Sequence, residues 1–278
     1  MSRGAIFITG ASTGIGRATA IRLANAGYTV IPGLRRDEPL PAPVSAPVLL
    51  DLADPTSIAP ACKDVLERAD GNLVGLVNNA GMSIGGVFEG LTMEDWRGQF
   101  EVNLFGHIAI TRALFPGLLS NKGRIVTVGS IGGRMSLPYL GPYTASKFAV
   151  RGWMDSLRSE ISSQGMRAVL IEPGSIATPL WEKGTSDANS RLEGLPDEMR
   201  SRYEKHVNGA LHMAAVAEKQ AIPPDRVAKV IEQALTAQKP KGRYLVGPDA
   251  HIQAVVAAMP TRILDGVMKA LIRPRDSV

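Results

Sequence analysis

Residues 5–16, AIFITGASTGIG, decide the fold class of this sequence. An apolar run of strand length leads directly into a glycine-rich turn with the spacing G-x-x-x-G-x-G, and a helical pattern follows. The backbone N–H groups and the dipole at such a helix N-terminus favour an anion, and glycines leave room for a phosphate. The stretch therefore predicts a phosphate-binding turn, with a tight turn that binds no ligand as the alternative. The candidate contacts are Gly10, Ser12, Thr13, Gly14, Ile15 and Gly16.

Strand-like apolar runs alternate with helical patterns along most of the chain. We expect strands at residues 5–9, 29–33, 48–51, 75–78, 124–129, 167–172 and 244–246. We expect helices at 15–25, 55–69, 93–120 (as two helices), 143–163 and 224–237. This alternation, with strands that are apolar throughout, is typical of a parallel sheet covered on both faces. The predicted fold is a single α/β domain over residues 1–250, with a doubly wound, Rossmann-like parallel sheet of about seven strands and helices on both faces.

Two further regions depart from this alternation. Residues 181–222 are polar and charged with patchy helical periodicity, and we expect a lid-like insertion, with a mobile surface excursion as the alternative. Residues 251–278 mix apolar side chains with arginine and lysine and contain Pro260. They predict an amphipathic helix pair that packs on the domain, with a partner subunit or a membrane surface as alternatives.

Composition limits the class of protein. The 278 residues are 45% hydrophobic and 21% charged, which is enough for a sizeable core. The net charge is +5, but the basic residues are scattered, so we expect no nucleic-acid partner. The apolar runs of the predicted strands fall far short of the roughly 20 residues of a membrane span, so we expect no transmembrane span. The single cysteine, Cys62, fits a reducing compartment and a cytoplasmic protein, and the four histidines lack metal-ligand spacing, so we expect no metal.

The predicted second strand ends in GLRR, where a dinucleotide fold meets the adenosine ribose. Leu34 stands where an acid would bind the ribose hydroxyls of NAD, and Arg35 and Arg36 follow it. Because guanidinium groups pair with phosphate, we expect NADP(H), with NAD(H) as the alternative cofactor. Two solvated arginines are the competing interpretation. Asp51, followed by Leu52, is expected to meet the adenine, although a turn or N-cap role explains Asp51 nearly as well.

Polar side chains follow the predicted fourth and fifth strands. NNAG, residues 78–81, ends one strand, Ser130 ends the next, and Asn103 lies in the helix between them. Tyr143 and Lys147 are four apart and therefore share one helix face. Since ligands of such sheets bind at the carboxyl ends of the strands, we expect these side chains to lie together.

The chain resembles the short-chain dehydrogenase/reductase family over about residues 4–180. The motifs that carry the resemblance are T-G-x-x-x-G-x-G, N-N-A-G, the helix Asn, the Ser, Y-x-x-x-K and P-G-x-x-x-T, in that order. The residues around Tyr143 and the segment VLIEPGSIATPLW are similar to the steroid- and retinol-dehydrogenase branch. The resemblance implies interconversion of an alcohol and a carbonyl with NAD(P), and a homodimer or homotetramer joined through the helices at 93–120 and 143–163.

The resemblance also implies residue roles. The implied catalytic residues are Asn103, Ser130, Tyr143 and Lys147. The further implied cofactor contacts are Asn78, Ala80, Gly81, Tyr143, Lys147, Pro173, Gly174, Ile176 and Thr178. Ser130 would hold the substrate oxygen, Lys147 the nicotinamide ribose, and Asn103 a water chain to Lys147.

Tyrosine with its usual pKa near 10 is too weak a base for this chemistry. An ammonium about 4 Å away contributes roughly 4 kcal/mol at an effective dielectric of 20, or about three pKa units. We therefore expect Lys147 to lower the pKa of Tyr143 toward 7, with burial opposing the change.

The segment between Ser130 and Tyr143 borders the reacting carbon and is apolar. Together with neighbouring segments it predicts a site for a lipophilic secondary alcohol or ketone, with core or lid packing as the alternative. The candidate substrate contacts are Met82, Ile84, Ser130, Met135, Leu137, Tyr139, Leu140, Tyr143, Leu180 and Trp181.

Two other functions fit the same scaffold. One is an epimerase or dehydratase with a retained cofactor, although such relatives usually carry a larger C-terminal substrate domain. The other is a non-enzymatic NADP-sensing regulator, against which the intact Ser130, Tyr143 and Lys147 argue.

Overall fold

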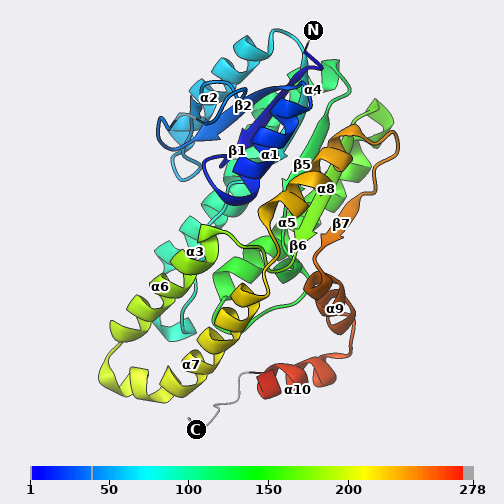
Figure 1. Cartoon of the computed structure of the whole chain (residues 1–278). Helices are drawn as coiled ribbons and strands as arrows, with labels where there is room; N and C mark the ends of the chain where they lie inside the picture. The colour runs from blue at the N-terminus through cyan, green and yellow to red at the C-terminus, as the bar shows by residue number, and fades with distance from the viewer. Residues whose placement is uncertain (1, 39, 272–278) are drawn as a thin grey trace.

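A parallel seven-stranded sheet runs through the protein in the computed structural model, which describes residues 2–38 and 40–271 (Figure 1). The strands are β1 (Ala5–Thr9), β2 (Thr29–Leu34), β3 (Val48–Leu49), β4 (Leu73–Asn78), β5 (Arg124–Val128), β6 (Arg167–Pro173) and β7 (Arg243–Val246). Their order is β3-β2-β1-β4-β5-β6-β7, and the strand pairs are parallel. The order reverses between β1 and β4, which confirms the doubly wound fold and puts the ligand crevice outside the carboxyl ends of these strands.

Helices cover both faces of the sheet. One apolar cluster joins the sheet to α2 (Pro55–Ala69), α4 (Gly106–Ser120) and α5 (Gly141–Ile161). A second joins it to α1 (Gly14–Asn25) and α8 (Pro224–Thr236). Within β1, Phe7 belongs to the first cluster and Ile6 and Ile8 to the second, as expected because successive side chains of a strand point to opposite faces. Both faces are buried, so the strand carries no polar alternation.

The helical stretch Met93–Ser120 is continuous, where the sequence predicted two helices. It consists of α3 (Met93–Phe100), a π-helical turn η2 (Glu101–Phe105) and α4. By length and composition alone it is the one helix among the described residues that could cross a membrane, and 44% of its most apolar window is buried. In this fold Ile110 and Leu114 of α4 pack into the core. The absence of a transmembrane span stays a prediction.

The expected boundaries differ by a few residues at most ends. Gly27 and Gly165 have φ values of +88° and +81° and follow α1 and a short 3-10 turn η4 (Ser162–Gln164), as expected of residues that end helices. The third strand is shorter than predicted, because Leu50 still bonds to Leu34 but Asp51 already begins a turn. Two other short 3-10 turns are η1 (Phe88–Gly90) and η3 (Ile131–Gly133).

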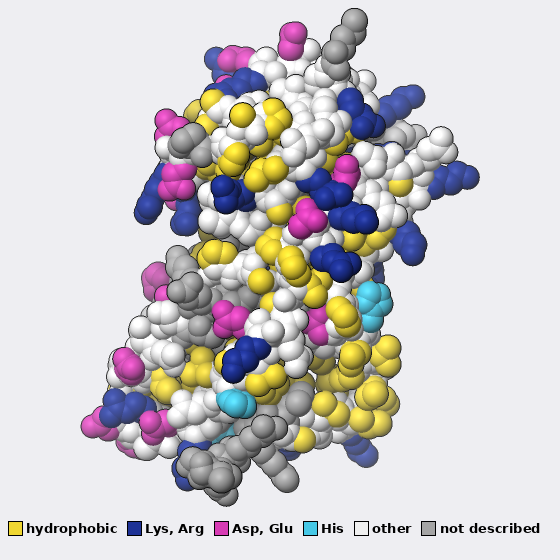
Figure 2. Space-filling view, in the orientation of Figure 1, with side chains coloured by type: hydrophobic (Ala, Val, Ile, Leu, Met, Phe, Trp, Pro, Cys, Tyr) yellow, Lys and Arg dark blue, Asp and Glu magenta, His cyan; other side chains and the backbone are white. Residues whose placement is uncertain are grey.

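The predicted insertion forms two helices, α6 (Pro179–Glu193) and α7 (Asp197–Lys219), which extend beyond the carboxyl edge of the sheet (Figure 1). The C-terminal segment forms α9 (Pro248–Val256) and α10 (Thr261–Leu271), separated at Pro260 as expected. Helix α9 packs on β7 and η3, and α10 contacts α7. Figure 2 shows hydrophobic side chains gathered over these helices, and Ile252 and Val255 are each 66% exposed. The lid role of 181–222 and the domain boundary stay predictions.

Candidate active site

The glycine-rich turn is interlocked with the segment that follows β4. Gly10 and Gly14 have positive φ values of +66° and +52°. A Cβ on Gly10 would lie 2.7 Å from Ala80 Cα, and one on Gly16 would overlap the Gly10 carbonyl oxygen. The Asn79 side-chain amide donates to the carbonyls of Thr9 (2.9 Å) and Gly10 (3.0 Å). The glycines are therefore required by the packing of the chain itself, before any ligand is considered.

Asn79 was missed from the predicted contacts, although the second Asn of NNAG was a visible signal. Its neighbour Asn78 takes the opposite role. Asn78 is fully buried and donates to the hydroxyls of Thr111 (3.0 Å) and Thr127 (3.4 Å). The Asn78 side chain therefore points into the core, and the predicted cofactor contact of this residue stays a prediction.

The side chains of Leu52 and Ile176 are likewise buried, each residue being 4% exposed and packed in an apolar cluster, and their predicted cofactor contacts stay predictions. Pro173 is also buried, while Gly174 and Thr178 remain partly accessible beside it. Asp51 accepts a hydrogen bond from the Ala53 N–H (2.9 Å), so its carboxylate forms the turn that was the alternative interpretation.

A surface open to a phosphate lies at the carboxyl ends of β1 and β2. Ser12, Thr13 and Ile15 are at least partly accessible at the start of α1, whose first turn contains no acidic residue. Arg35 and Arg36 are both exposed just beyond β2, whereas Leu34 is 3% exposed and points inward. The position that would bind the ribose hydroxyls of NAD therefore holds Leu34 instead of a carboxylate, and two arginines follow it in the chain.

Three of the four predicted catalytic side chains converge where β5 ends and α5 begins. A Cβ placed on Gly132 would lie 3.3 Å from Ser130 Oγ and 3.4 Å from Tyr143 Cε1. Lys147 Nζ lies 5.8 Å from the centroid of the Tyr143 ring and donates to the Val128 carbonyl (3.2 Å). The ammonium is thus held beside the phenol by the end of β5, as the four-residue spacing on one helix face requires.

Asn103, the fourth predicted residue, lies in the π-helical turn and is fully buried. Its Oδ1 accepts from the Met82 N–H (2.9 Å), and its Nδ2 donates to the Met82 carbonyl (3.0 Å) and to Ser146 Oγ (3.1 Å). A Cβ on Gly81 would lie 3.4 Å from Asn103 Oδ1 and 3.9 Å from Lys147 Nζ. The inserted residue of a π-turn redirects a side chain, which accounts for an Asn in a helix interior. Its water chain to Lys147 stays a prediction.

The pKa values in this cluster differ from the expectation. Burial raises the pKa of Tyr143, and the Ser130 hydroxyl opposes that rise. Burial lowers the pKa of Lys147 from 10.5 to about 8. The predicted fall of the Tyr143 pKa is therefore wrong for the protein alone, because desolvation disfavours phenolate more than the ammonium at this distance stabilises it. At neutral pH Tyr143 carries its proton, the form that can protonate a carbonyl oxygen.

His107 is buried, and only one of its two ring nitrogens has a hydrogen-bond partner among the described residues. Its Nε2 donates to the Ala80 carbonyl (2.8 Å), and Nδ1 has no partner among the described residues. Its pKa falls to about 4, chiefly because of burial and also because of the Lys147 charge. The ring is therefore neutral at pH 7.

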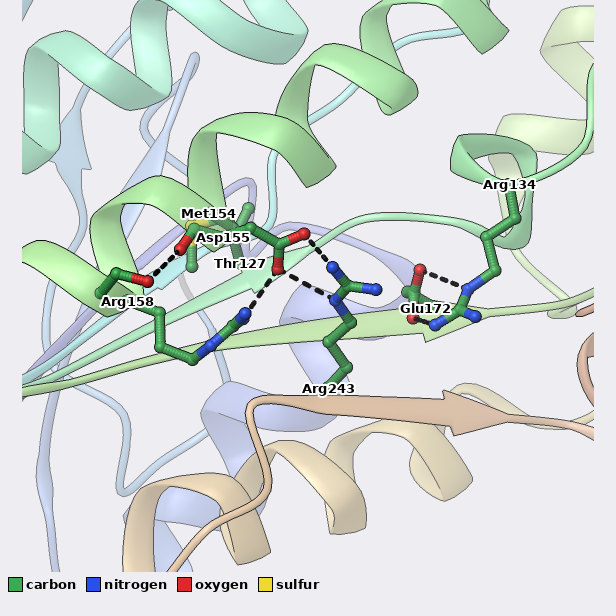
Figure 3. A network of polar contacts seen from close by, with 8 residues as sticks. Thr127, Arg134, Met154, Asp155, Arg158, Glu172 and Arg243 are labelled. Carbon is green, nitrogen blue, oxygen red and sulfur yellow. Dashed lines mark hydrogen bonds and ion pairs between the residues drawn. The ribbon is translucent and has the colours of Figure 1, made fainter. Parts of the chain in front are cut away.

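An ion pair that sequence reasoning missed connects the serine turn to β6. Arg134 donates to both oxygens of Glu172, at 2.8 and 2.5 Å, and the Glu172 side chain is only 1% exposed (Figure 3). The contact raises the pKa of Arg134 further. It joins η3, which directly follows Ser130, to the residue before Pro173. The two residues are 38 apart in sequence, so no local sequence pattern predicts that they pair.

The predicted substrate segments lie side by side. The Gly86 N–H donates to the Tyr139 carbonyl (2.8 Å), which pairs the segment after Gly81 with the segment before Tyr143. Tyr139 has a φ of +64°, unusual for a bulky residue, and its ring packs on Val87, Leu192 and Val207.

Residues of α6 and α7 thus pack against the segment before Tyr143. Met82 is partly accessible, Met135 is 5% exposed and Leu180 is 38% exposed. The side chain of Trp181, another predicted contact, lies outside the described part of the chain.

Comparison with known proteins agrees with this geometry. A family model for short chain dehydrogenases matches residues 4–189. Retinol dehydrogenase 5 of Mus musculus is 33% identical over 288 residues, covering 98% of this chain and 90% of the relative. The NADPH-dependent 3-dehydrocapnine reductase of Ornithobacterium rhinotracheale is 31% identical and covers 94% of each chain. The protein belongs to the short-chain dehydrogenase/reductase family and, within it, to the steroid/retinol branch.

Solved structures support the same family. A short-chain dehydrogenase from Streptomyces avermitilis has a TM-score of 0.76 at 30% identity, covering 98% of this chain and 96% of that one. A short chain dehydrogenase from Burkholderia cenocepacia J2315, solved with NADP, has a TM-score of 0.74 at 25% identity, with coverages of 96% and 98%.

Proposed function

We propose that the protein is an NADP(H)-dependent oxidoreductase that interconverts a lipophilic secondary alcohol, of steroid or retinoid type, and its ketone. The observation that carries this proposal is the convergence of Ser130, Tyr143 and Lys147 at the carboxyl edge of the sheet. Bound NADPH would supply the hydride for reduction. Ser130 holds the substrate oxygen, and Tyr143 donates its proton to that oxygen, since its raised pKa keeps it protonated at neutral pH. Lys147 holds the cofactor ribose and keeps a positive charge beside the phenol.

The residues present fit this cofactor. The tight glycine turn leaves the N-terminus of α1 open to the phosphates, and the exposed Arg35 and Arg36 suit an additional phosphate on the ribose. The NADPH dependence of one relative and the NADP complex of one structural neighbour support the choice. Replacing both arginines with Ala should weaken NADPH binding by at least tenfold and change NADH binding less than threefold, on the order of two lost ion-pair contacts. Equal losses would refute the preference for NADP(H).

The decisive experiment measures NADPH oxidation with ketosteroids, retinal and aromatic ketones, and repeats the panel with NADH. Tyr143→Phe should abolish turnover and leave the NADPH dissociation constant within about threefold, because only the proton donor is removed. Tyr28→Phe is the matched control, since Tyr28 packs against Arg3 at the opposite end of the sheet. Turnover that survives Tyr143→Phe would remove Tyr143 from the mechanism.

We also propose a homo-oligomer joined through the helical stretches at residues 93–120 and 143–163, which contain α3, η2, α4 and α5. Phe105 and Phe148 are 51% and 42% exposed, which is unusual for aromatic side chains that meet only water. Phe105 also lines a groove of about 310 Å³, together with Trp96, Arg97, Phe100 and Glu101. The free, buried Cys62 supports a cytoplasmic setting.

A further inference from the structure

The loop of residues 173–178, which the family motif assigns to the nicotinamide, is held by segments from distant parts of the chain. The Gly174 N–H donates to the carbonyl of Val246 at the end of β7 (2.9 Å). Ser175 and Ala177 exchange backbone hydrogen bonds of 3.0 Å with Ile222, which follows α7. These backbone bonds fix the path of the loop but leave the Ser175 N–H without a backbone partner.

Asp249, in the first turn of α9, supplies that partner. Its Oδ2 accepts from the Ser175 N–H at 2.7 Å, a short bond of the kind formed with a charged acceptor. A Cβ on Gly174 would overlap both carboxylate oxygens, and a Cβ on Gly247 would lie 2.6 Å from Oδ1. The carboxylate therefore lies directly over Gly174, and glycines on both sides make room for it.

Helix α9 also touches the catalytic side of the site. It packs on η3, the turn that directly follows Ser130, and Ala250, next to Asp249, is fully buried. His251 of α9 lines a hollow of about 250 Å³ together with Arg134 and Glu172, the ion pair drawn in Figure 3. One helix thus contacts both the serine turn and the loop after β6.

We propose that Asp249 is a positioning residue that holds the 173–178 loop in the conformation needed to cover the nicotinamide. This inference rests on the proposed function. Asp249 acts through Ser175, because its carboxylate is bonded to the loop backbone. It makes the C-terminal helix α9 part of the cofactor site, although Asp249 follows Ser175 by 74 residues in the chain.

The test compares Asp249→Ala with Asp249→Asn, because the Asn carbonyl still accepts from the Ser175 N–H. Asp265→Ala, which removes an exposed carboxylate on α10, is the matched control. Two properties are measured: amide hydrogen exchange at Ser175 in the protein without cofactor, and the NADPH dissociation constant by fluorescence titration. In the Ala variant the Ser175 amide should exchange about tenfold faster, and the NADPH dissociation constant should rise about tenfold. Both changes are on the order of one lost hydrogen bond to a charged group. The Asn variant should restore most of both properties, and the control should change neither.

Unchanged Ser175 exchange in the Ala variant would overturn the proposal, as would faster exchange with unaltered NADPH affinity. Ala and Asn variants that are equally impaired, or both unfolded, would assign Asp249 to general stability and also overturn it. If the wild-type protein bound no NADPH, the proposed function itself would fail. The Ser175 exchange rates would then show separately whether Asp249 holds the loop.

Discussion

Replacing Lys147 with Met should make the protein more stable at pH 7 while removing its catalytic activity. Burial lowers the pKa of Lys147 from 10.5 to about 8. Each pKa unit corresponds to about 1.4 kcal/mol, so holding the buried charge costs about 3 kcal/mol of folding free energy at neutral pH. The hydrogen bond from Nζ to the Val128 carbonyl returns about 1 kcal/mol, which the Met variant loses. The net gain expected for Lys147→Met is about 2 kcal/mol at pH 7.

The difference in stability between the wild type and the Met variant should depend on pH. Below pH 8 the folded protein carries the charge and bears the whole cost. Between about pH 8 and 10.5 the folded state releases the proton while the unfolded chain keeps it, so the stability of the wild type rises with pH. The advantage of the Met variant should therefore shrink steadily across this interval.

Urea unfolding of both proteins at several pH values between 6 and about 10.5 measures the difference directly. Lys229→Met, which removes an exposed lysine on α8, is the control and should show no comparable pH-dependent difference. A Lys147→Met variant that is less stable at pH 7, or whose advantage does not change with pH, would refute the assignment of a destabilising buried ammonium. NADPH oxidation by the same variant should be lost.

Three further predictions concern packing and surfaces. Gly16→Ala should destabilise the protein by more than about 2 kcal/mol in urea unfolding, because the added Cβ would overlap a backbone carbonyl. Gly152→Ala, whose Cβ would have no atom within 4 Å, should stabilise α5 by about 0.5–1 kcal/mol. Similar changes in unfolding free energy for the two variants would contradict the packing described around Gly16. Burial raises the pKa of the Cys62 thiol to about 11. Ellman's reagent at pH 8 should therefore label the native protein about a hundredfold more slowly than the urea-unfolded chain. Rapid labelling of the native protein would be inconsistent with a buried thiol. Phe105→Glu should shift the oligomer toward monomer in light scattering, and an unchanged mass would place the interface elsewhere.

The candidate site residues that the sequence predicted share one property: they lie only a few residues apart in the chain. Tyr143 and Lys147 are four apart on one helix, and the glycines of the first turn lie within seven residues. A helix face or a tight turn converts such spacings directly into proximity. The convergence of Ser130 with this pair also followed, because parallel strands bring their carboxyl ends to one edge of the sheet.

The residues whose side-chain contacts the sequence did not predict have partners far away in the chain. Asn78 and Asn79 are adjacent and chemically identical, yet one bonds into the core and the other to the glycine turn. Periodicity places them on opposite faces of a strand end but does not say which face holds a free donor or acceptor. Asp249 meets Ser175 only because β7 and α9, which come after α6, α7 and α8 in the chain, return to the same edge of the sheet.

The amino-acid sequence by itself determined the order of strands and helices, the glycine-rich turn and the spacing of Tyr143 and Lys147 on one helix face, since each depends on neighbours within a few residues. The tertiary structure alone decided the protonation of the site. The pKa of Tyr143 rises and that of Lys147 falls because the segments packed around them desolvate both groups. It also decided which backbone groups are left for distant side chains such as Asp249 to bind.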